Sequence, residues 1–170
     1  MGQVYLKVLT GKIDEILELQ KVLESAPNYS MNVSGSLPSP VESQSLFSAL
    51  PPNKEYKDKF VLGFYSDNEM FGCADIIRGY PNEKVAMIGL LLISEKFQTK
   101  GFGRMTYDLV EKLCLSWPEI EIARIGVVET NSVVMPFWEK MGFLKTGERK
   151  PYSEGVIEST NIVLEKRIKI

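Results

Sequence analysis

The sequence predicts one domain of the α/β (α+β) class. Segments with strand-like character alternate along the chain with segments that place their apolar residues on one helical face. The length of 170 residues is enough for one domain, which at this size buries about 70% of the surface of the unfolded chain. Internal repeats and low-complexity segments are absent from the sequence. We therefore expect a single domain over residues 1–170.

The N-terminal third predicts one strand and two helices. Residues 4–9 alternate like a short strand, and residues 12–23 place their isoleucines and leucines mainly on one helical face. Residues 28–40 are polar and contain glycine, two prolines and several serines, which predicts a loop. Residues 41–50 are compatible with a second helix that stops at the two prolines that follow.

The remaining chain predicts strands around one long helix. Two of the strands form a hairpin with residues 66–69 as its turn, and Pro118 ends the helix. A turn over residues 151–155 joins the last two strands. In chain order, we expect strands at 60–65, 70–77, 87–93 and 120–128, a helix at 102–115 after the third of these, and strands at 143–149 and 156–165.

The composition argues against several classes of protein. The net charge is −2, so no basic field attracts nucleic acid or anionic lipid. The longest apolar run is too short to cross a membrane, and nothing resembles a signal peptide. The two cysteines are predicted to be reduced, buried thiols. We therefore expect a cytoplasmic protein with no nucleic-acid or membrane partner.

The chain contains no histidine. This excludes Ser–His and Cys–His nucleophile pairs and any imidazole ligand for zinc, and we predict no metal site. Acid–base chemistry must come from Asp, Glu, Lys, Tyr, Cys or water.

A glycine loop between a strand and a helix is the most informative stretch. Its sequence is Gln98-Thr99-Lys100-Gly101-Phe102-Gly103-Arg104. The first turn of a helix has unpaired N–H groups and lies at the positive end of the helix dipole, so it attracts anions. Gly101 and Gly103 allow the main chain to approach a phosphate closely, and Lys100 and Arg104 add positive charge. The loop predicts a diphosphate ligand.

Two common phosphate loops do not match this stretch. A Walker loop has its lysine directly after the second glycine, whereas Lys100 precedes Gly101. A dinucleotide fingerprint needs a third glycine where this chain has Thr106. The loop instead resembles motif A of the GNAT acyltransferase superfamily, Gln/Arg-x-x-Gly-x-Gly/Ala, which Gln98, Gly101 and Gly103 match. In that family the loop holds the pyrophosphate of coenzyme A.

A second signature of the same family follows at the usual spacing. It consists of Asn131, Trp138 seven positions later, and the pair Gly142-Phe143. The resemblance covers residues 59–165 well and the N-terminal third in outline. It implies a mixed, mostly antiparallel twisted sheet of about six or seven strands flanked by about four helices.

The resemblance also implies a coenzyme site. Besides the loop, main-chain groups of Leu91, Leu92 and Ile93 would pair with the pantetheine arm as an added strand does. Asn131 would bond the pantetheine, cap the next helix, or do both. The implied donor is acetyl-CoA, the acceptor is a primary amine of a small molecule or peptide, and a homodimer is compatible with the family.

The family reaction requires an acid for the leaving thiolate and a hydrogen-bond donor for the acyl oxygen. The resemblance assigns the hydrogen-bond donor to a main-chain N–H near Leu92. Many members carry the acid, a tyrosine, where this chain has Trp138, whose indole N–H cannot supply a proton. Trp138 either packs against the coenzyme or fills the core. Among the tyrosines we favour Tyr152 as the substitute acid over Tyr80 and Tyr107, because it lies in a late turn.

Three carboxylates are candidates for the base that deprotonates the acceptor. Asp75 interrupts an apolar strand and either faces solvent, which we favour, or points into the acceptor cleft. Glu129 ends a strand near the place where family members gather catalytic groups, and Glu83 precedes another strand. Arg78 follows Asp75 closely and would meet an acidic group of the substrate.

Two functional classes fit these residues. The first is an N-acetyltransferase that works by direct attack in a ternary complex. The second is an acyl-CoA-binding regulatory module with weak or no catalysis, which Trp138 keeps open. A carboxylate or tyrosine hydroxyl near the thioester would favour the enzyme, which we prefer, and a wholly apolar cleft would favour the module.

Overall fold

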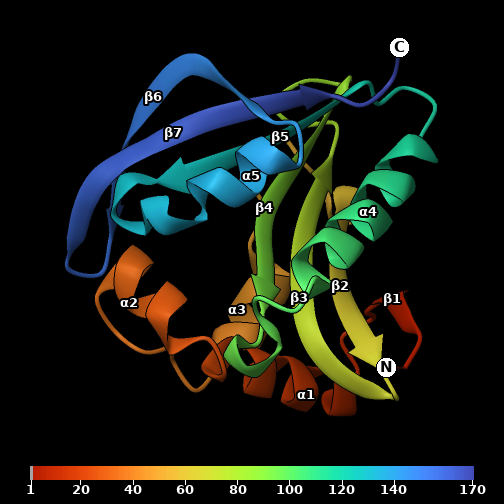
Figure 1. Ribbon diagram of the computed structural model, residues 1–170, viewed down its shortest axis with the longest axis vertical. Coiled ribbons are helices and arrows are strands. Elements are labelled where there is room, and N and C mark those ends of the chain that lie inside the picture. The colour runs from red at the N-terminus through yellow and green to blue at the C-terminus, as the bar shows by residue number, and fades with distance from the viewer. Residues whose placement is uncertain (1) are drawn as a thin grey trace.

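A seven-stranded sheet runs through the computed structural model, which describes residues 2–170 (Figure 1). The strands lie in the order β1-β2-β3-β4-β5-β7-β6. All neighbouring strands are antiparallel except β4 and β5, which are parallel. This confirms the mixed, mostly antiparallel sheet. The strands are β1 (Val4–Val8), β2 (Lys59–Ser66), β3 (Glu69–Arg78), β4 (Val85–Ile93), β5 (Ile122–Val128), β6 (Leu144–Glu154) and β7 (Ile157–Arg167).

Helices cover both faces of the sheet. They are α1 (Ile13–Glu24), α2 (Pro27–Ser34), α3 (Glu42–Ser48), α4 (Phe102–Leu115) and α5 (Met135–Lys140), with short 3-10 turns η1 (Tyr56–Asp58), η2 (Glu95–Phe97) and η3 (Glu129–Val134). Successive side chains of a strand point to opposite faces. Accordingly Val61 of β2 joins the apolar cluster under α1, and its neighbour Leu62 joins the larger cluster under α4 and α5. None of the helices within residues 2–170 is both long and apolar enough to cross a membrane.

The predicted β2–β3 hairpin is confirmed. Ser66 pairs with Glu69, and Asp67 and Asn68 between them adopt positive φ angles of 52° and 65°. Two successive residues with positive φ form the turn type whose twist matches that of the flanking strands.

The prediction of a loop over residues 28–40 is wrong for its first half. Residues 27–34 form α2, and only the residues after it are irregular. The helix starts with Pro27 in its first turn and ends at Gly35, which adopts the left-handed conformation with φ of 76°. Proline at the start and glycine at the end are common helix boundaries, so the sequence did contain a signal for α2.

The predicted turn over residues 151–155 is also wrong. Strand β6 continues to Glu154, and the reversal takes place around Gly155, which has φ of 56°. Tyr152 is therefore a strand residue, paired with Ser159 of β7.

The sheet opens between β4 and β5. Their parallel pairing ends at Ile88 and Ile125, so the last residues of both strands have no partner across the gap. Next to this point, Asp75 pairs with Leu90 whereas Ile76 pairs with Ile88, which leaves Gly89 as an extra residue in β4. An extra residue of this kind bends a strand. Figure 1 shows the two strand ends diverging.

Candidate active site

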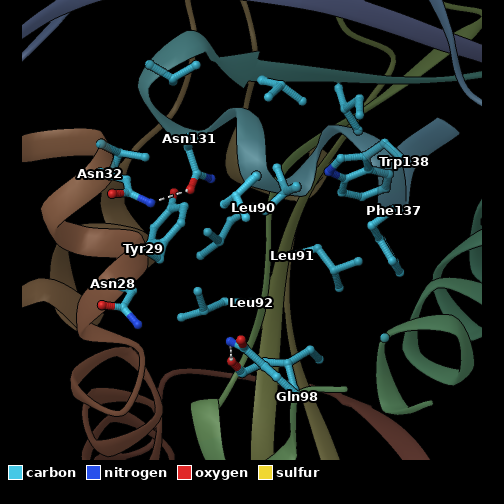
Figure 2. A pocket seen from close by; sticks show the side chains of 18 of the residues that line it. Asn28, Tyr29, Asn32, Leu90, Leu91, Leu92, Gln98, Asn131, Phe137 and Trp138 are labelled. Atoms are coloured by element: carbon cyan, nitrogen blue, oxygen red, sulfur yellow. Dashed lines mark hydrogen bonds between the residues drawn. The ribbon is translucent and has the colours of Figure 1, made fainter. Parts of the chain in front are cut away.

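A cavity of about 440 Å³ fills the opening between β4 and β5 (Figure 2). We call it the central cavity. Its walls come from the diverging strands, from η3 and α5, from the residues before and within the first turn of α4, and from α2. Residues that lie far apart in the sequence therefore meet around one space. The named residues that Figure 2 labels on its walls are Asn28, Tyr29, Asn32, Leu90, Leu91, Leu92, Gln98, Asn131, Phe137 and Trp138.

The start of α4 has the geometry of an anion site. Gly101 occupies the N-cap position in the left-handed conformation, with φ of 85°, and no side chain caps the helix. The N–H groups of Phe102, Gly103 and Arg104 donate no main-chain hydrogen bond within residues 2–170. A Cβ atom built on Gly101 would meet no atom within 4 Å, so the space in front of these donors is open. Lys100 and Arg104 are exposed beside it.

At position 103, glycine is required because there is no space for a side chain. A Cβ atom built on it would lie 3.0 Å from the ring of Phe137. Contacts this short are rarely tolerated in a packed interior. Gly103 thus lets α4 and α5 approach each other at the rim of the cavity.

The free edge of β4 forms one wall of the central cavity. Residues 89–93 line the cavity, and beyond Ile88 they have no strand partner on the β5 side. The side chain of Gln98 folds back on this edge and donates a hydrogen bond of 2.8 Å to the carbonyl of Ile93. The remaining main-chain groups of this edge can pair with an extended ligand, as a sheet edge pairs with an added strand.

Helix α2 forms the opposite wall, and contacts from distant parts of the chain hold it there. Asn32 donates from its amide to the side-chain oxygen of Asn131, 3.1 Å away, and the Thr130 hydroxyl donates to the Asn32 carbonyl at 2.6 Å. The Tyr152 hydroxyl donates to the carbonyl of Val33 at 2.8 Å. This wall was not predicted from the sequence, because residues 28–34 were expected to lie in a loop.

Asn131 does not cap α5. The helix begins at Met135 with Val134 at its N-cap position, and Asn131 lies earlier, in η3, with non-helical backbone angles. Its buried side chain instead joins α2 and lines the central cavity. The cap interpretation was wrong, and a contact with pantetheine remains a prediction.

Trp138 fills the core and also lines the cavity. It is only 8% exposed, and the rings of Phe137 and Phe143 meet it edge to face with centroids 5.1 Å apart. One part of the ring nevertheless faces the central cavity.

The tyrosines proposed as acids are engaged elsewhere. The Tyr152 hydroxyl holds α2, as described above, and the Tyr107 hydroxyl donates at 3.1 Å to Glu111, one turn further along α4. Tyr80 lies in the turn that precedes β4, at the end of that strand farther from the cavity.

Another tyrosine, which was not among the predicted acids, lines the central cavity. Tyr29 projects from α2, and Figure 2 shows its hydroxyl directed toward the Asn32–Asn131 hydrogen bond. Its hydroxyl forms no hydrogen bond with another side chain of the described part of the chain. Burial, with a smaller electrostatic effect of Tyr152, raises the pKa of Tyr29 well above its ordinary value.

Asp75 lies at a second cavity, of about 260 Å³, on the α1 and α3 side of β4. We call it the acceptor-side cavity. The Asp75 side chain is 13% exposed, and Oδ1 accepts a hydrogen bond of 2.9 Å from the buried Lys59. Our preference for a solvent-facing Asp75 was therefore wrong. Burial raises the pKa of Asp75, and the lowering effect of the Lys59 contact does not cancel it.

The other two acidic candidates lie outside these cavities. Glu129 is exposed, forms an ion pair with Arg149 of β6, and is absent from the linings of both cavities. Glu83 is exposed in the turn before β4. Arg78 does not meet a cleft either, because it pairs with Glu119 and lies over the ring of Trp117, 5.2 Å from its centroid.

No potential metal site is present among residues 2–170, since no three Cys, Asp or Glu side chains there are close enough to share an ion.

Comparisons with known proteins give one family. The model of the acetyltransferase (GNAT) family matches residues 28–143. No curated protein sequence is a significant match.

Solved structures share the fold over the whole chain. An acetyltransferase from Thermus thermophilus has a TM-score of 0.70 and 22% identity, over 96% of this chain and 98% of that one. An N-acetyltransferase from Staphylococcus aureus has a TM-score of 0.72 and 10% identity, over 98% and 99%. The PaiA N-acetyltransferase from Thermoplasma acidophilum, in complex with coenzyme A, has a TM-score of 0.64 and 17% identity, over 97% and 99%. At these identities the similarity establishes the fold.

Proposed function

Because this chain belongs to the GNAT acetyltransferase family, we propose that it transfers an acetyl group from acetyl-CoA to a primary amine of a small molecule or peptide, by direct attack in a ternary complex. One observation carries this proposal. A path of unpaired main-chain groups leads from the start of α4, along the free edge of β4, to the wall that the central and acceptor-side cavities share. The T. acidophilum protein with this fold, which is a complex with coenzyme A, supports the choice of ligand.

The residues along the path fit such a ligand. The N–H groups of Phe102, Gly103 and Arg104 would hold the pyrophosphate, with the Lys100 side chain adding charge. Gly101 suits this role because a side chain there would occupy the open space in front of the donors. Main-chain groups of residues 91–93 would pair with the pantetheine arm. When bound, acetyl-CoA supplies an activated acyl carbonyl and a good leaving group.

Asp75 is our proposed base. Acceptor amines carry a proton at neutral pH, since a lysine-like amine has a pKa of about 10.4. A carboxylate whose pKa is raised accepts a proton more readily than an ordinary one. The second oxygen of Asp75 lies near Gly89, where a built Cβ atom would be 3.4 Å from it, so the carboxylate sits beside the bend of β4.

Tyr29 is our proposed hydrogen-bond donor at the acyl end. It is the residue with a side-chain hydroxyl that lines both cavities, and its hydroxyl is free to turn toward a ligand. Such a donor stabilises negative charge as it develops on the acyl oxygen or the sulfur. We further propose that the protein works in the cytoplasm, in keeping with its two buried free thiols.

Thermal unfolding with and without acetyl-CoA tests the ligand. A hundredfold excess over Kd stabilises a protein by about 2.7 kcal/mol, which for a chain of this size raises Tm by about 5–11 °C. NAD and ATP serve as controls and should produce no shift. A shift with either control, or none with acetyl-CoA, would contradict the assignment of the ligand.

Thiol release from acetyl-CoA in the presence of an amine panel tests the reaction. We expect release that depends on both the amine and Asp75. A Tm shift with acetyl-CoA but no release with any amine would identify a binding module instead.

A further inference from the structure

The acceptor-side cavity carries information about the amine. Apolar side chains of α1, α3 and β4 form its walls, namely Leu23, Leu46, Leu90 and Leu92. Its polar groups are two carboxylates, Asp75 and Glu42, two serines, and the Tyr29 hydroxyl. Its volume of about 260 Å³ has room for about nine water-sized groups of about 30 Å³ each. The cavity thus suits a short apolar chain with polar ends.

The acceptor-side cavity adjoins the central cavity. Tyr29, Gly89, Leu90 and Leu92 line both, so the two spaces share a wall at the bend of β4. A molecule in the acceptor-side cavity therefore lies beside the bend of β4, next to the end of the central cavity that is farther from the start of α4.

The charge of the lining favours cations. No lysine or arginine is among the lining residues that the structure describes, whereas both Asp75 and Glu42 are. The Lys59 ammonium balances the negative charge of Asp75, with 2.9 Å between Lys59 Nζ and Asp75 Oδ1. Glu42 forms no ion pair among residues 2–170, and the Ser39 hydroxyl donates to its carboxylate at 3.3 Å. An acceptor with a carboxylate of its own would meet Glu42 and no lysine or arginine of the lining.

Glu42 is placed at the mouth of this cavity. It is exposed, in the first turn of α3. Gln20 of α1 fixes that turn, because its side chain accepts from the Ser43 N–H at 3.0 Å and donates to the Ser39 carbonyl at 2.8 Å. A carboxylate held at the mouth can meet the far end of a molecule whose near end lies beside Asp75.

From this arrangement, and resting on the proposed function, we propose that the acceptor is a small dication: two amino groups joined by a short apolar chain, one reacting beside Asp75 and the other held by Glu42. The reacting ammonium gives one proton to Asp75 and attacks the acyl carbon. The C–N bond forms as the C–S bond breaks. The second proton of the nitrogen passes to the thiolate sulfur through water, and Asp75 returns its proton to solvent, which leaves an amide and a free thiol.

Three amines of matched length test this proposal in the thiol-release assay: 1,4-diaminobutane, butylamine and 4-aminobutanoate. We expect kcat/KM to be highest for the diamine, by about fivefold or more over butylamine, and lowest for the amino acid. Glu42→Gln should remove the preference for the diamine over butylamine. Glu42→Lys should reverse the order of the two charged amines. Glu139→Gln, at an exposed position on α5 outside both cavities, is the control and should change nothing.

Equal rates for diamine and butylamine, or a diamine preference that survives Glu42→Gln, would overturn the proposal. Failure of the proposed function looks different, because then no amine releases thiol. In that case the same amines are titrated by calorimetry into the protein saturated with coenzyme A. Diamine binding that depends on Glu42 supports the site without catalysis, and its absence refutes the site.

Discussion

The substitution Gly101→Asp tests the proposed anion site most directly. Gly101 has φ of 85° and precedes the free N–H groups of α4, and a Cβ atom there meets no atom within 4 Å. A side chain at this position therefore projects into open space and disturbs no packing. Two separate effects are expected, one on stability and one on binding.

The stability effect comes from the backbone. A residue other than glycine in the left-handed conformation costs about 1–2 kcal/mol. For a domain of this size we expect Tm to fall by about 2–8 °C. The matched variant Gly101→Asn has nearly the same shape without the charge, and asparagine tolerates this conformation at least as well.

The binding effect comes from the charge. A carboxylate about 5 Å from a unit charge of a diphosphate repels it by about 1–3 kcal/mol at an effective dielectric constant between about 80 and 20. This corresponds to a loss of affinity of about 5- to 150-fold for each unit of charge. Salt screens exposed charges, so the loss should shrink as ionic strength rises.

Calorimetric titration of both variants with coenzyme A at low and high salt separates the two effects. We expect Gly101→Asn to bind nearly as the wild type and Gly101→Asp to bind much more weakly. Equal affinities of the two variants would refute a diphosphate site at the start of α4.

Three further substitutions test other parts of the structure. Burial alone would raise the pKa of Glu15, but the hydrogen bonds that its carboxylate accepts at the start of α1 lower this pKa below the ordinary value of 4.5. These hydrogen bonds stabilise the folded protein above pH 4.5, and the stabilisation is lost as the pH falls through the lowered pKa. Glu15→Gln should therefore flatten the decline of Tm at acid pH. Tyr152→Phe removes the hydrogen bond to Val33, and we expect a loss of about 0.5–1.5 kcal/mol in denaturant unfolding together with a raised KM for acetyl-CoA. Asp75→Asn should lower kcat/KM by about 10²–10⁴-fold at neutral pH; because burial raises the pKa of Asp75, the wild-type rate should fall as the pH drops through that raised pKa, and the variant should lack this limb in a pH–rate profile.

The backbone geometry at the start of α4 was predictable because its requirements are local. A left-handed residue, a free helix start and nearby cations all follow from consecutive residues, and the structure has Gly101 with positive φ at the N-cap of α4. The hairpin turn over residues 66–69 was predictable for the same reason. Such features depend little on the rest of the fold.

The α2 wall could not be predicted in the same way. Its helix has few apolar residues, and contacts from residues distant in sequence, among them Asn131 and Tyr152, hold it in place. Only the boundary residues Pro27 and Gly35 marked it. A site wall that depends on tertiary contacts leaves little trace in a local pattern.

The direction in which the acidic side chains point could not be predicted from the sequence either. Both faces of β3 are covered, so its neighbouring residues are apolar on either side and alternation does not reveal which face Asp75 takes. For Glu129, the position at the end of β5 was right, but Arg149 of β6 pairs with the side chain outside the cavities. In both cases the acidic side chain pairs with a basic residue of another strand, and the local sequence does not reveal this pairing.

The raised pKa of Tyr29 constrains what this residue can do. A tyrosine has an ordinary pKa of about 10, already above the value of about 8.5 for a thiol. Because burial raises the pKa of Tyr29 further, complete proton transfer to a thiolate would be uphill, and the hydroxyl stays neutral at all working pH values. Tyr29 is therefore suited to donating a hydrogen bond, and less suited to being a general acid. In the proposed reaction a neutral donor is enough, because a thiolate leaves without full protonation, and the proposal therefore needs no tyrosine at the position of Trp138.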